Sequence, residues 1–356
     1  MGNKPAIPDL LAKLVITPQM LRAIAELDEF KGRWQALGQL APERLLVLRR
    51  VATIESVGSS TRIEGAKLSD TEVDRLLSGL TTTSFRSRDE EEVAGYAEAM
   101  ELVFESYADI SLTENHIKQL HGTLLKHASK DQRHRGGYKT LPNQVEAFDP
   151  DGRSLGVVFA TAAPFDTPRL MQELVAWTRR ALDKKEYHPL LVIGVFVVRF
   201  LAVHPFQDGN GRLARILTTL LLLRAGYTYV PYSSLERVIE ENKDQYYLAL
   251  RHAQSTLDTD ESRLGEWVSF LLRSLVAQKS ALERRIERER LMAPLPPLSE
   301  KLLQIAREHG RLTTASGTKI TGANRNTVKL HLRQLVEGGH LVANGRGKGT
   351  WYSLRR

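Results

Sequence analysis

Two apolar segments, separated by nine residues of mixed polarity, limit the folds open to this chain. Residues 190–203 are apolar except for Arg199, and a proline stands just before this segment. A membrane span needs about 20 apolar residues, so a buried central helix suits the segment better. Residues 213–225 have a helical composition and end before Gly226, a residue suited to closing a helix. We therefore expect two buried helices joined by a loop.

The connecting loop has the sequence His-Pro-Phe-Gln-Asp-Gly-Asn-Gly-Arg and occupies residues 204–212. It leads into the start of a helix, where unpaired backbone N–H groups and the helix dipole attract anions. Gly209 and Gly211 let the backbone turn its N–H groups inward and leave room for a ligand. Asn210 tolerates left-handed backbone geometry better than most residues. The loop therefore predicts an anion site.

The charged side chains of the loop indicate which chemistry the anion undergoes. Arg212 and Arg215 lie on one face of the first helical turn, where two cations oppose the dipole unless a phosphate offsets them. Asp208 would repel that phosphate, so we expect Mg²⁺ between the two. His204 titrates near neutral pH and can accept a proton from an incoming hydroxyl. Together these residues predict transfer chemistry on a phosphate.

Residues 204–215 resemble the active-site motif HxFx(D/E)GNGRxxR of Fic-domain proteins and match it at every defined position. The resemblance implies that AMP passes from ATP to a Tyr, Ser or Thr hydroxyl of a target protein, the chain itself included, with release of pyrophosphate. It implies that His204 deprotonates the hydroxyl, that Asp208 holds Mg²⁺ and that Phe206 anchors the loop. The implied phosphate ligands are Gly209, Asn210, Gly211 and Arg212, with the γ-phosphate on Arg215.

Residues 60–65, with the sequence Ser-Thr-Arg-Ile-Glu-Gly, form a second motif. Taken alone, this pattern also suits a serine that caps a helix and a glycine that ends one. It resembles the inhibitory motif (S/T)xxxE(G/N), which one class of Fic proteins carries N-terminal to the core, with Ser60, Glu64 and Gly65 at the defined positions. The resemblance implies that Glu64 pairs with Arg215 and repels the γ-phosphate, so that ATP binds misaligned for attack.

Two other segments extend the resemblance. A hairpin predicted between Gly136 and Pro164, with its turn at 149–152, lies where Fic proteins carry a flap that pins the target by strand addition. Lys139 stands where the family usually has Arg. The flap residues would be Val145, Glu146, Ala147 and Phe148. The sequence Tyr-Tyr-Leu-Ala-Leu at 246–250 resembles a segment that borders the adenine. It implies nucleotide contacts for Tyr246, Tyr247 and Gln254, although tyrosine pairs in amphipathic helices also pack in cores.

The positive charge of the chain is concentrated in its last segment. Residues 295–356 contain 11 Lys and Arg against 3 Asp and Glu, a net charge of +8, which equals the net charge of the whole chain with 50 basic and 42 acidic residues. Prolines at 294, 296 and 297 mark a stiff linker before this segment. Helices are expected at 299–309, with Ser299 as a cap, and at 313–320 and 324–337. Strand, glycine-rich turn and strand follow over 340–354.

This order of elements is similar to a winged helix, although Gly317 interrupts the second helix. The basic excess favours DNA as the partner, with the third helix as recognition helix and the hairpin tip as wing. The expected DNA contacts are Arg325, Asn326, Lys329, Arg333, Arg346 and Lys348. Docking of a protein or of a second copy is the alternative, and the dependence of binding on salt separates the two.

We expect a mainly α architecture with three parts. These are a helical N-terminal region with the inhibitory helix (1–90), a Fic helical core with a small β-hairpin flap (91–290) and a C-terminal winged helix-turn-helix domain (295–356). Amphipathic helices are expected at 21–37 and 43–55, and a further helix at 90–107. The chain has no cysteine, which excludes disulfides and a cysteine-based zinc site.

We expect a soluble, cytoplasmic protein with no membrane partner, because the first residues lack the apolar region of a signal peptide. ATP would be its co-substrate and Mg²⁺ its cofactor, and a homodimer would hold the inhibitory helix in place. Other functions use the same loop: transfer of phosphate or another nucleotide, or removal of AMP from a modified protein with Glu64 orienting water. A DNA-binding regulator whose core only senses nucleotide is the third alternative. His204 and Asp208 argue against it, because binding alone needs no base.

Overall fold

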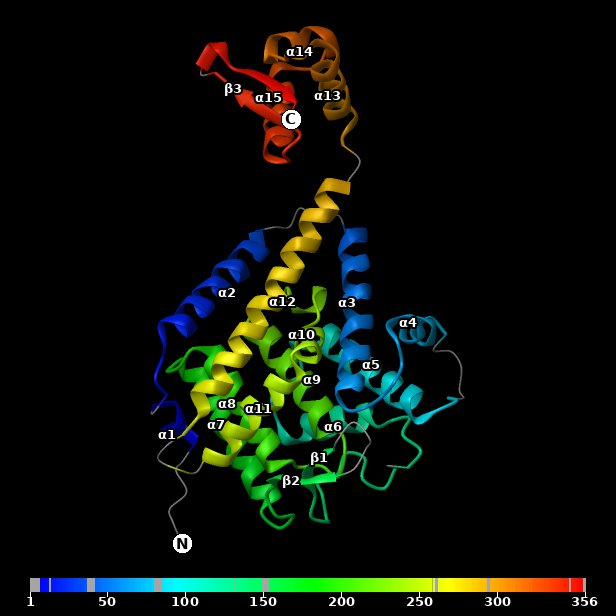
Figure 1. Ribbon diagram of the computed structural model, residues 1–356, viewed down its shortest axis with the longest axis vertical. Coiled ribbons are helices and arrows are strands. Elements are labelled where there is room, and N and C mark those ends of the chain that lie inside the picture. The colour runs from blue at the N-terminus through cyan, green and yellow to red at the C-terminus, as the bar shows by residue number, and fades with distance from the viewer. Residues whose placement is uncertain are drawn as a thin grey trace. The chain divides into compact units, whose positions relative to one another are not determined.

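The computed structural model describes residues 7–12, 14–36, 42–79, 85–130, 132–148, 154–257, 259, 262–292, 295–345 and 347–354. The protein is mainly α, as the sequence predicts (Figure 1). It divides into two compact units, Met1–Leu282 and Glu283–Arg356. The boundary between the units lies within helix α12 (Leu264–Met292), before the proline-rich linker that the sequence suggests.

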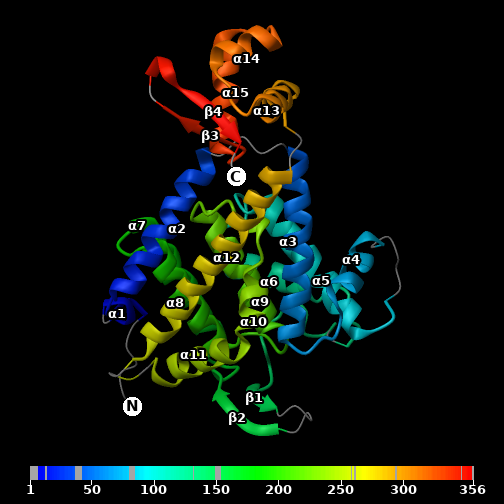
Figure 2. The ribbon, with the colours of Figure 1, turned by 45° about the horizontal axis from the view of Figure 1, so that its top comes forward.

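The first unit is built from helices that pack around a buried centre. Its N-terminal helices are α1 (Ile7–Ala12), α2 (Pro18–Ala36), α3 (Pro42–Ile63) and α4 (Asp70–Ser78). The helices that follow are α5 (Arg88–Ser106), α6 (Glu114–Leu124), α7 (Thr167–Lys184), α8 (Pro189–Val203), α9 (Asn210–Arg224), the 3-10 helix η1 (Val230–Tyr232), α10 (Leu235–Glu241) and α11 (Lys243–Thr256). Both views show α9 in the middle of this unit with α3 along one side (Figures 1 and 2).

Helix α8 confirms the prediction of a buried central helix. Its side chains are apolar except for Arg199, and Val192, Phe196 and Phe200 are fully buried. It packs against α7, α9 and α11. Pro189 occupies the first turn, where its missing N–H costs nothing. A helix that is apolar nearly all round needs protein on all sides, so the loop at its end is fixed to the core.

Helix α3 is longer than the sequence predicts. We expected a helix at 43–55 followed by the inhibitory segment, but α3 continues without a break to Ile63 and contains Ser60. Ser60 therefore caps no helix. Gly58 does not interrupt α3, and a Cβ there would lie 2.7 Å from Nη1 of Arg62. Gly65, with a φ of 105°, follows the helix and takes the left-handed turn that favours glycine.

The predicted hairpin is present in the backbone, but its first strand begins at Gln144, since residues 136–143 form no strand. Strand β1 (Gln144–Phe148) pairs antiparallel with β2 (Ser154–Ala160), with Val145 opposite Phe159 and Glu146 opposite Val157. The register shifts twice, which marks irregularities in the ladder. The predicted turn at 149–152 lies outside the described residues. Figure 2 shows the hairpin projecting from the helices of the first unit.

The second unit has the predicted order of elements. Three helices precede a hairpin: α13 (Pro297–His309), α14 (Thr314–Thr321), α15 (Arg325–Glu337), β3 (Leu341–Asn344), the short η2 (Gly347–Gly349) and β4 (Trp351–Leu354). Strands β3 and β4 pair antiparallel, and Leu312 forms a further bridge to Tyr352. Leu302, Val328 and Leu332 are fully buried in a core of its own.

Two details of the second unit correct the sequence analysis. Ser299 does not cap α13, because the helix already begins at Pro297, and the Ser299 hydroxyl is buried in a 2.8 Å hydrogen bond with Nδ1 of His331. Gly317 lies inside α14 without ending it. A Cβ there would lie 2.9 Å from Cδ2 of Leu302, so close packing against α13 explains the glycine.

No helix among the described residues is both long and apolar enough to cross a bilayer.

Candidate active site

The loop between α8 and α9 begins at a residue with a strained backbone. His204 has φ 51° and ψ 60°, and its N–H donates to the Phe200 carbonyl at 2.9 Å. Among the described residues only Lys185 shares a positive φ without being glycine. Such a conformation costs about 1–3 kcal/mol and persists where surrounding contacts impose it, often at functional sites. The chain thus leaves α8 abruptly at the predicted base.

The hydrogen bond of the His204 ring fixes which nitrogen carries the proton. Nδ1 lies 3.2 Å from the Leu201 carbonyl oxygen, which can only accept, so Nδ1 is the donor. Nε2 of the neutral ring therefore keeps its lone pair. Burial lowers the pKa of His204 to about 4, against the opposing effect of nearby Glu64 and Asp208. The ring is neutral at physiological pH and can accept a proton.

His121 of α6 contacts the loop and holds it in place, a role that was not predicted from the sequence. Its ring stacks on Phe206 with centroids 3.8 Å apart. Nδ1 accepts from the Gly136 N–H at 3.0 Å, so Nε2 is the donor to the Asp208 carbonyl at 3.0 Å. Burial lowers the pKa of His121 to about 4, which keeps the ring in this neutral form. A histidine on the apolar face of a helix gives no local signal of such a role.

Lys139 and Asn143 hold the loop from the side of the hairpin. The Lys139 ammonium is buried and donates to the Val203 carbonyl at 3.0 Å, to Asn143 Oδ1 at 2.8 Å and to Thr161 Oγ1 at 2.9 Å. Burial lowers the pKa of Lys139 to about 8. Asn143 in turn donates to the Phe206 carbonyl at 2.7 Å. Lys139, noted as a departure from the family pattern, thus provides a cation that ties the end of α8 to the hairpin.

Helix α9 begins at Asn210, three residues earlier than predicted. Gly209 is its N-cap and takes the left-handed conformation with φ 77°. The expectation of a left-handed Asn210 is therefore wrong. Its buried side chain accepts from the Phe206 N–H at 2.9 Å and donates to the Phe206 carbonyl at 2.7 Å. Both hydrogen bonds of the Asn210 carboxamide are therefore made within the loop. A ligand would be bound by the backbone N–H of Asn210, not by its side chain.

The predicted contact between Glu64 and Arg215 is present. Arg215 Nη2 donates to Glu64 Oε1 at 2.7 Å and to the Ser60 carbonyl at 2.9 Å, and its Nε donates to Ser60 Oγ at 2.8 Å. A Cβ on Gly211 would lie 2.3 Å from Glu64 Oε1. The Glu64 carboxylate therefore lies against the first turn of α9, where the sequence predicts an anion.

The charges of this pair stabilise each other. Burial raises the pKa of Glu64, but the neighbouring charged groups, Arg215 first among them, together lower it by more, so the net pKa lies below the ordinary value. Burial lowers the pKa of Arg215, but Glu64, Tyr246 and Tyr96 together raise it by more, so the net pKa lies above the ordinary value. The guanidinium is almost fully buried, whereas the Glu64 side chain keeps 32% of its exposure. The acid is thus the accessible member of the pair.

Asp208 belongs to a cluster of four alternating charges. Its Oδ2 accepts from Arg212 Nη2 at 3.1 Å and from Arg88 Nη2 at 3.2 Å. Glu92 holds the same two cations, with Oε2 at 2.9 Å from Arg212 Nη1 and Oε1 at 2.8 Å from Arg88 Nε. Arg88 and Glu92 were missed in the sequence because they belong to another helix.

The residues around Asp208 suit a metal ion whose coordination shell is completed by the phosphates of a nucleotide. The described residues contain no group of three or more His, Cys, Asp and Glu side chains able to hold a metal ion. Mg²⁺ is commonly bound by one or two carboxylates plus substrate phosphates and waters. One carboxylate beside a helix N-terminus meets that requirement.

Helix α11 carries the predicted adenine residues, and it places Tyr246 and Tyr247 near the Glu64–Arg215 pair with different exposures. Tyr246 is buried against Trp267 and Phe270. This is the position expected of a tyrosine that packs in the core, which was the alternative to a contact with adenine. Burial raises its pKa, and Arg215 opposes that rise. Tyr247 is 39% exposed, and its hydroxyl donates to the Ile63 carbonyl at 3.5 Å. Gln254 is half-buried near the end of α11.

The remaining predicted residues belong to β1 and to the second unit. The backbones of Val145, Glu146, Ala147 and Phe148 form β1, while their side chains lie outside the described part of the structure. Arg325, Asn326, Lys329 and Arg333 are exposed on α15, and Arg333 pairs with Glu337 at 2.7 Å. Arg346 lies outside the described residues. Lys348 is described only by its backbone, in η2.

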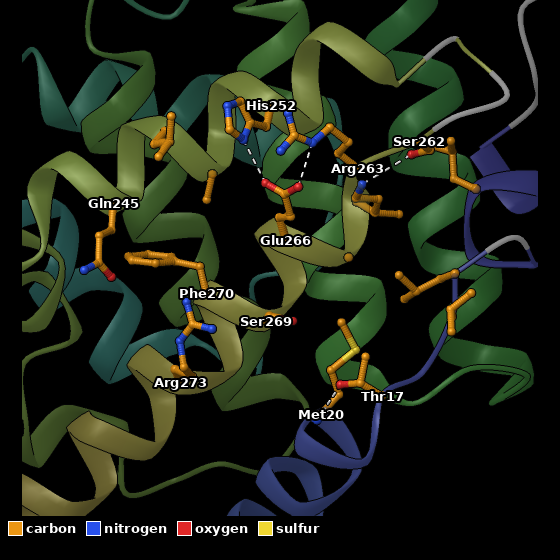
Figure 3. A pocket seen from close by; sticks show the side chains of 17 residues that line it. Thr17, Met20, Gln245, His252, Ser262, Arg263, Glu266, Ser269, Phe270 and Arg273 are labelled. Atoms are coloured by element: carbon orange, nitrogen blue, oxygen red, sulfur yellow. Dashed lines mark hydrogen bonds and ion pairs between the residues drawn. The ribbon is translucent and has the colours of Figure 1, made fainter.

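A cavity of about 680 Å³ lies elsewhere in the first unit (Figure 3). It opens between residues 10–20, α11 and the start of α12, and its wall combines apolar side chains such as Met20 and Phe270 with polar ones. Glu266 there pairs with His252 at 2.8 Å and Arg263 at 2.6 Å, as Figure 3 shows. No residue of the 204–215 loop lines this cavity, so it is distinct from the anion site.

The family model described as the Fic/DOC family matches residues 111–222, which include the whole loop and exclude residues 60–65. The protein adenylyltransferase Fic of Drosophila grimshawi is 26% identical over 234 residues, which cover 65% of this chain and 44% of that protein. Its counterpart in Drosophila melanogaster is 25% identical over 255 residues, covering 70% and 48%. The chain therefore spans less than half the length of these curated relatives.

Solved structures agree in fold. A Fic family protein from Desulfovibrio desulfuricans superposes with a TM-score of 0.60 at 24% identity, covering 96% of this chain and 97% of the other. A Fic domain containing signaling protein from Bacteroides thetaiotaomicron gives a TM-score of 0.57 at 26% identity, covering 74% and 97%.

Proposed function

The chain belongs to the Fic/DOC family, and on that premise we propose that it is an autoinhibited protein adenylyltransferase. It transfers AMP from ATP to a Tyr, Ser or Thr hydroxyl of a protein, itself included. One observation carries the autoinhibition: the Glu64 carboxylate is bonded to Arg215 at 2.7 Å. Relatives that are named protein adenylyltransferases support the reaction.

His204 is the base of the proposed reaction. Because Nδ1 donates to the Leu201 carbonyl, the lone pair on Nε2 is available for the target hydroxyl. As the hydroxyl proton moves to Nε2, the oxygen forms a bond to the α-phosphorus. The bond between that phosphorus and the bridging oxygen of pyrophosphate breaks, and pyrophosphate leaves. The bracing of the loop by His121 and Lys139 keeps the imidazole in place for this step.

The first turn of α9 binds the phosphates in this proposal. Its unpaired N–H groups, from Gly209 to Arg212, carry the positive end of the helix dipole, and Arg212 and Arg215 add two full charges. Asp208 would hold Mg²⁺, which when bound shields the negative charge of the phosphates. The α-phosphate is thereby presented to a hydroxyl that His204 deprotonates.

Glu64 opposes this arrangement. Its carboxylate uses the Arg215 guanidinium that the γ-phosphate would need, and it lies against Gly211 at the start of the helix. A γ-phosphate that enters this position would be repelled by the Glu64 carboxylate instead of being bound by Arg215. We therefore propose that ATP reaches its productive pose only when the end of α3 moves Glu64 away, since a small displacement of the α-phosphate suffices to prevent attack.

Labelling with ATP tests both parts of the proposal. We expect Glu64→Gly protein to incorporate more label from α-labelled ATP than wild type, into itself and into lysate proteins that mass spectrometry identifies. His204→Ala in the same background should abolish incorporation. Label from γ-labelled ATP would contradict AMP transfer and favour phosphate transfer. Release of AMP from a prelabelled protein by wild type, and not by Glu64→Gly, would favour the opposite reaction.

DNA binding is a second proposed function, assigned to residues 295–356. It is supported by the exposed Arg325, Lys329 and Arg333 on α15 and by a net charge of +8. In gel shifts, the logarithm of the binding constant should fall linearly with the logarithm of salt concentration. Lys329→Gln should reduce that slope by about 1, whereas Lys301→Gln on α13 should not. Absence of binding at low salt would favour docking of a protein.

A further inference from the structure

We infer that Arg88 competes with a divalent cation for Asp208, so that the resting enzyme is restrained at its metal ligand as well as at Arg215. This inference rests on the proposed function and adds a second restraint to it. Arg88 comes from the first turn of α5, outside the residues that the family model matches, and lies 120 positions from Asp208 in the sequence.

The Asp208 carboxylate is already neutralised in this structure. Its Oδ2 receives Arg88 at 3.2 Å and Arg212 at 3.1 Å, so two guanidinium groups share one oxygen. A divalent cation that approaches this carboxylate meets two positive charges at close range. Binding of the cation therefore requires that at least one guanidinium withdraw.

Arg88 is the member that can withdraw. The Arg212 side chain is 3% exposed and also holds Glu92 at 2.9 Å, so burial fixes it. The Arg88 side chain is 55% exposed, and its Nε keeps a separate bond to Glu92 at 2.8 Å. Arg88 can thus release Asp208 without losing every partner.

The surroundings of Arg88 leave room for that movement. Arg88 lines a cavity of about 310 Å³ together with Arg86, Glu91, Ser129 and Lys130. The backbone that carries it is fixed, because Ser87 caps α5 by accepting from the Glu90 N–H at 3.3 Å. The side chain can therefore change rotamer while the helix stays in place.

Metal-dependent nucleotide binding tests the inference without measuring catalysis. Binding of a fluorescent ADP analogue is titrated with Mg²⁺, and free Mn²⁺ is followed by electron paramagnetic resonance in the presence of ADP. The proteins are Glu64→Gly and Glu64→Gly/Arg88→Gln. Loss of an exposed pair should lower the metal concentration at half-saturation by about two- to fivefold. Arg86→Gln is the matched control, since Arg86 is exposed, two residues away, and has no described contact with Asp208.

Each other outcome contradicts the inference in a distinct way. An unchanged metal midpoint would show that Arg88 does not compete with the cation. Weaker nucleotide binding at every metal concentration would show that Arg88 is a phosphate ligand instead. A lower thermal midpoint with an unchanged metal midpoint would leave Arg88 a purely structural role.

Failure of the proposed function gives a different result. If α-labelled ATP labels no protein while the metal midpoint still shifts, adenylyl transfer is wrong and the competition at Asp208 stands. If AMP is transferred and the metal midpoint does not shift, adenylyl transfer stands and the competition at Asp208 is wrong.

Discussion

Replacing Glu240 by Gln should activate the enzyme without altering any residue that touches ATP. Arg62 lies two residues before Glu64 at the end of α3, and it joins that helix to α10. Its Nε and Nη2 donate to the two carboxylate oxygens of Glu240 at 2.6 and 3.0 Å. Glu240→Gln keeps the shape of the side chain and removes the charge. Arg62 then retains Asp70 at 3.0 Å and the Leu68 carbonyl at 2.9 Å.

The size of the effect follows from the geometry of this pair. The Arg62 and Glu240 side chains are 18% and 22% exposed, so water screens their interaction only in part. A hydrogen bond to a charged group contributes about 1.5–3 kcal/mol, and the amide of Gln keeps a fraction of it. We expect a loss of about 1–2 kcal/mol of the free energy that holds Glu64 in place, which corresponds to about 5- to 30-fold more of the released state.

The assay is the initial rate of self-labelling from α-labelled ATP. Asp74→Asn is the matched control, because Asp74 also joins α4 to α3, through Arg50 at 2.8 Å, but with side chains 47% and 62% exposed. Its rate should change by less than about twofold. In a Glu64→Gly background, Glu240→Gln should have no effect, since no carboxylate remains to be released. A Glu240→Gln rate equal to that of Asp74→Asn, with a lowered thermal midpoint, would refute the reasoning.

Three further outcomes follow from buried groups. Because burial lowers the pKa of Lys139 from 10.5 to about 8, the folded state binds fewer protons than the unfolded state between these values. The unfolding free energy of wild type relative to Lys139→Met should therefore fall by about 3 kcal/mol as pH drops from 10.5 to 8, which denaturant titration measures; a pH-independent difference would contradict this. His121→Gln in the Glu64→Gly background should lower the rate of labelling by about 100-fold at unchanged thermal midpoint, since loop misplacement acts on the reaction; equal rates would exclude a positioning role. Gly317→Ala should lower the unfolding free energy of the second unit by about 1–3 kcal/mol in calorimetry, because the new Cβ would lie 2.9 Å from Leu302; a rise would disprove the packing argument.

The helix–loop–helix centre of the protein was predictable because its signal is local. A segment that is apolar apart from Arg199, a glycine-rich loop and a second apolar segment each indicate their structure within about 15 residues. The same is true of the order of elements in the second unit. Local rules failed where two capping solutions compete: Gly209 takes the left-handed position expected of Asn210, and Pro297 starts the helix expected to begin at Ser299.

The contacts that position the site were not predictable from one sequence. His121, Lys139 and Arg88 are ordinary residues of their own segments, and only the fold brings them to the loop. The pairing of Glu64 with Arg215 was expected through the family resemblance alone, since no spacing rule links residues 151 positions apart. Long-range polar contacts of this kind depend on tertiary packing, which periodicity does not encode.

The close approach of Glu64 to Gly211 has a genetic consequence. A side chain at 211 would displace the acid at 64 from Arg215, so position 211 is free to vary only where the acid has been lost. Glutamate codons become glycine codons by one base change. Variants that lack the inhibitory Glu64 should therefore arise readily. In cells where the uninhibited labelling is toxic, we expect suppressor mutations to fall in residues 204–215 more often than they restore Glu64.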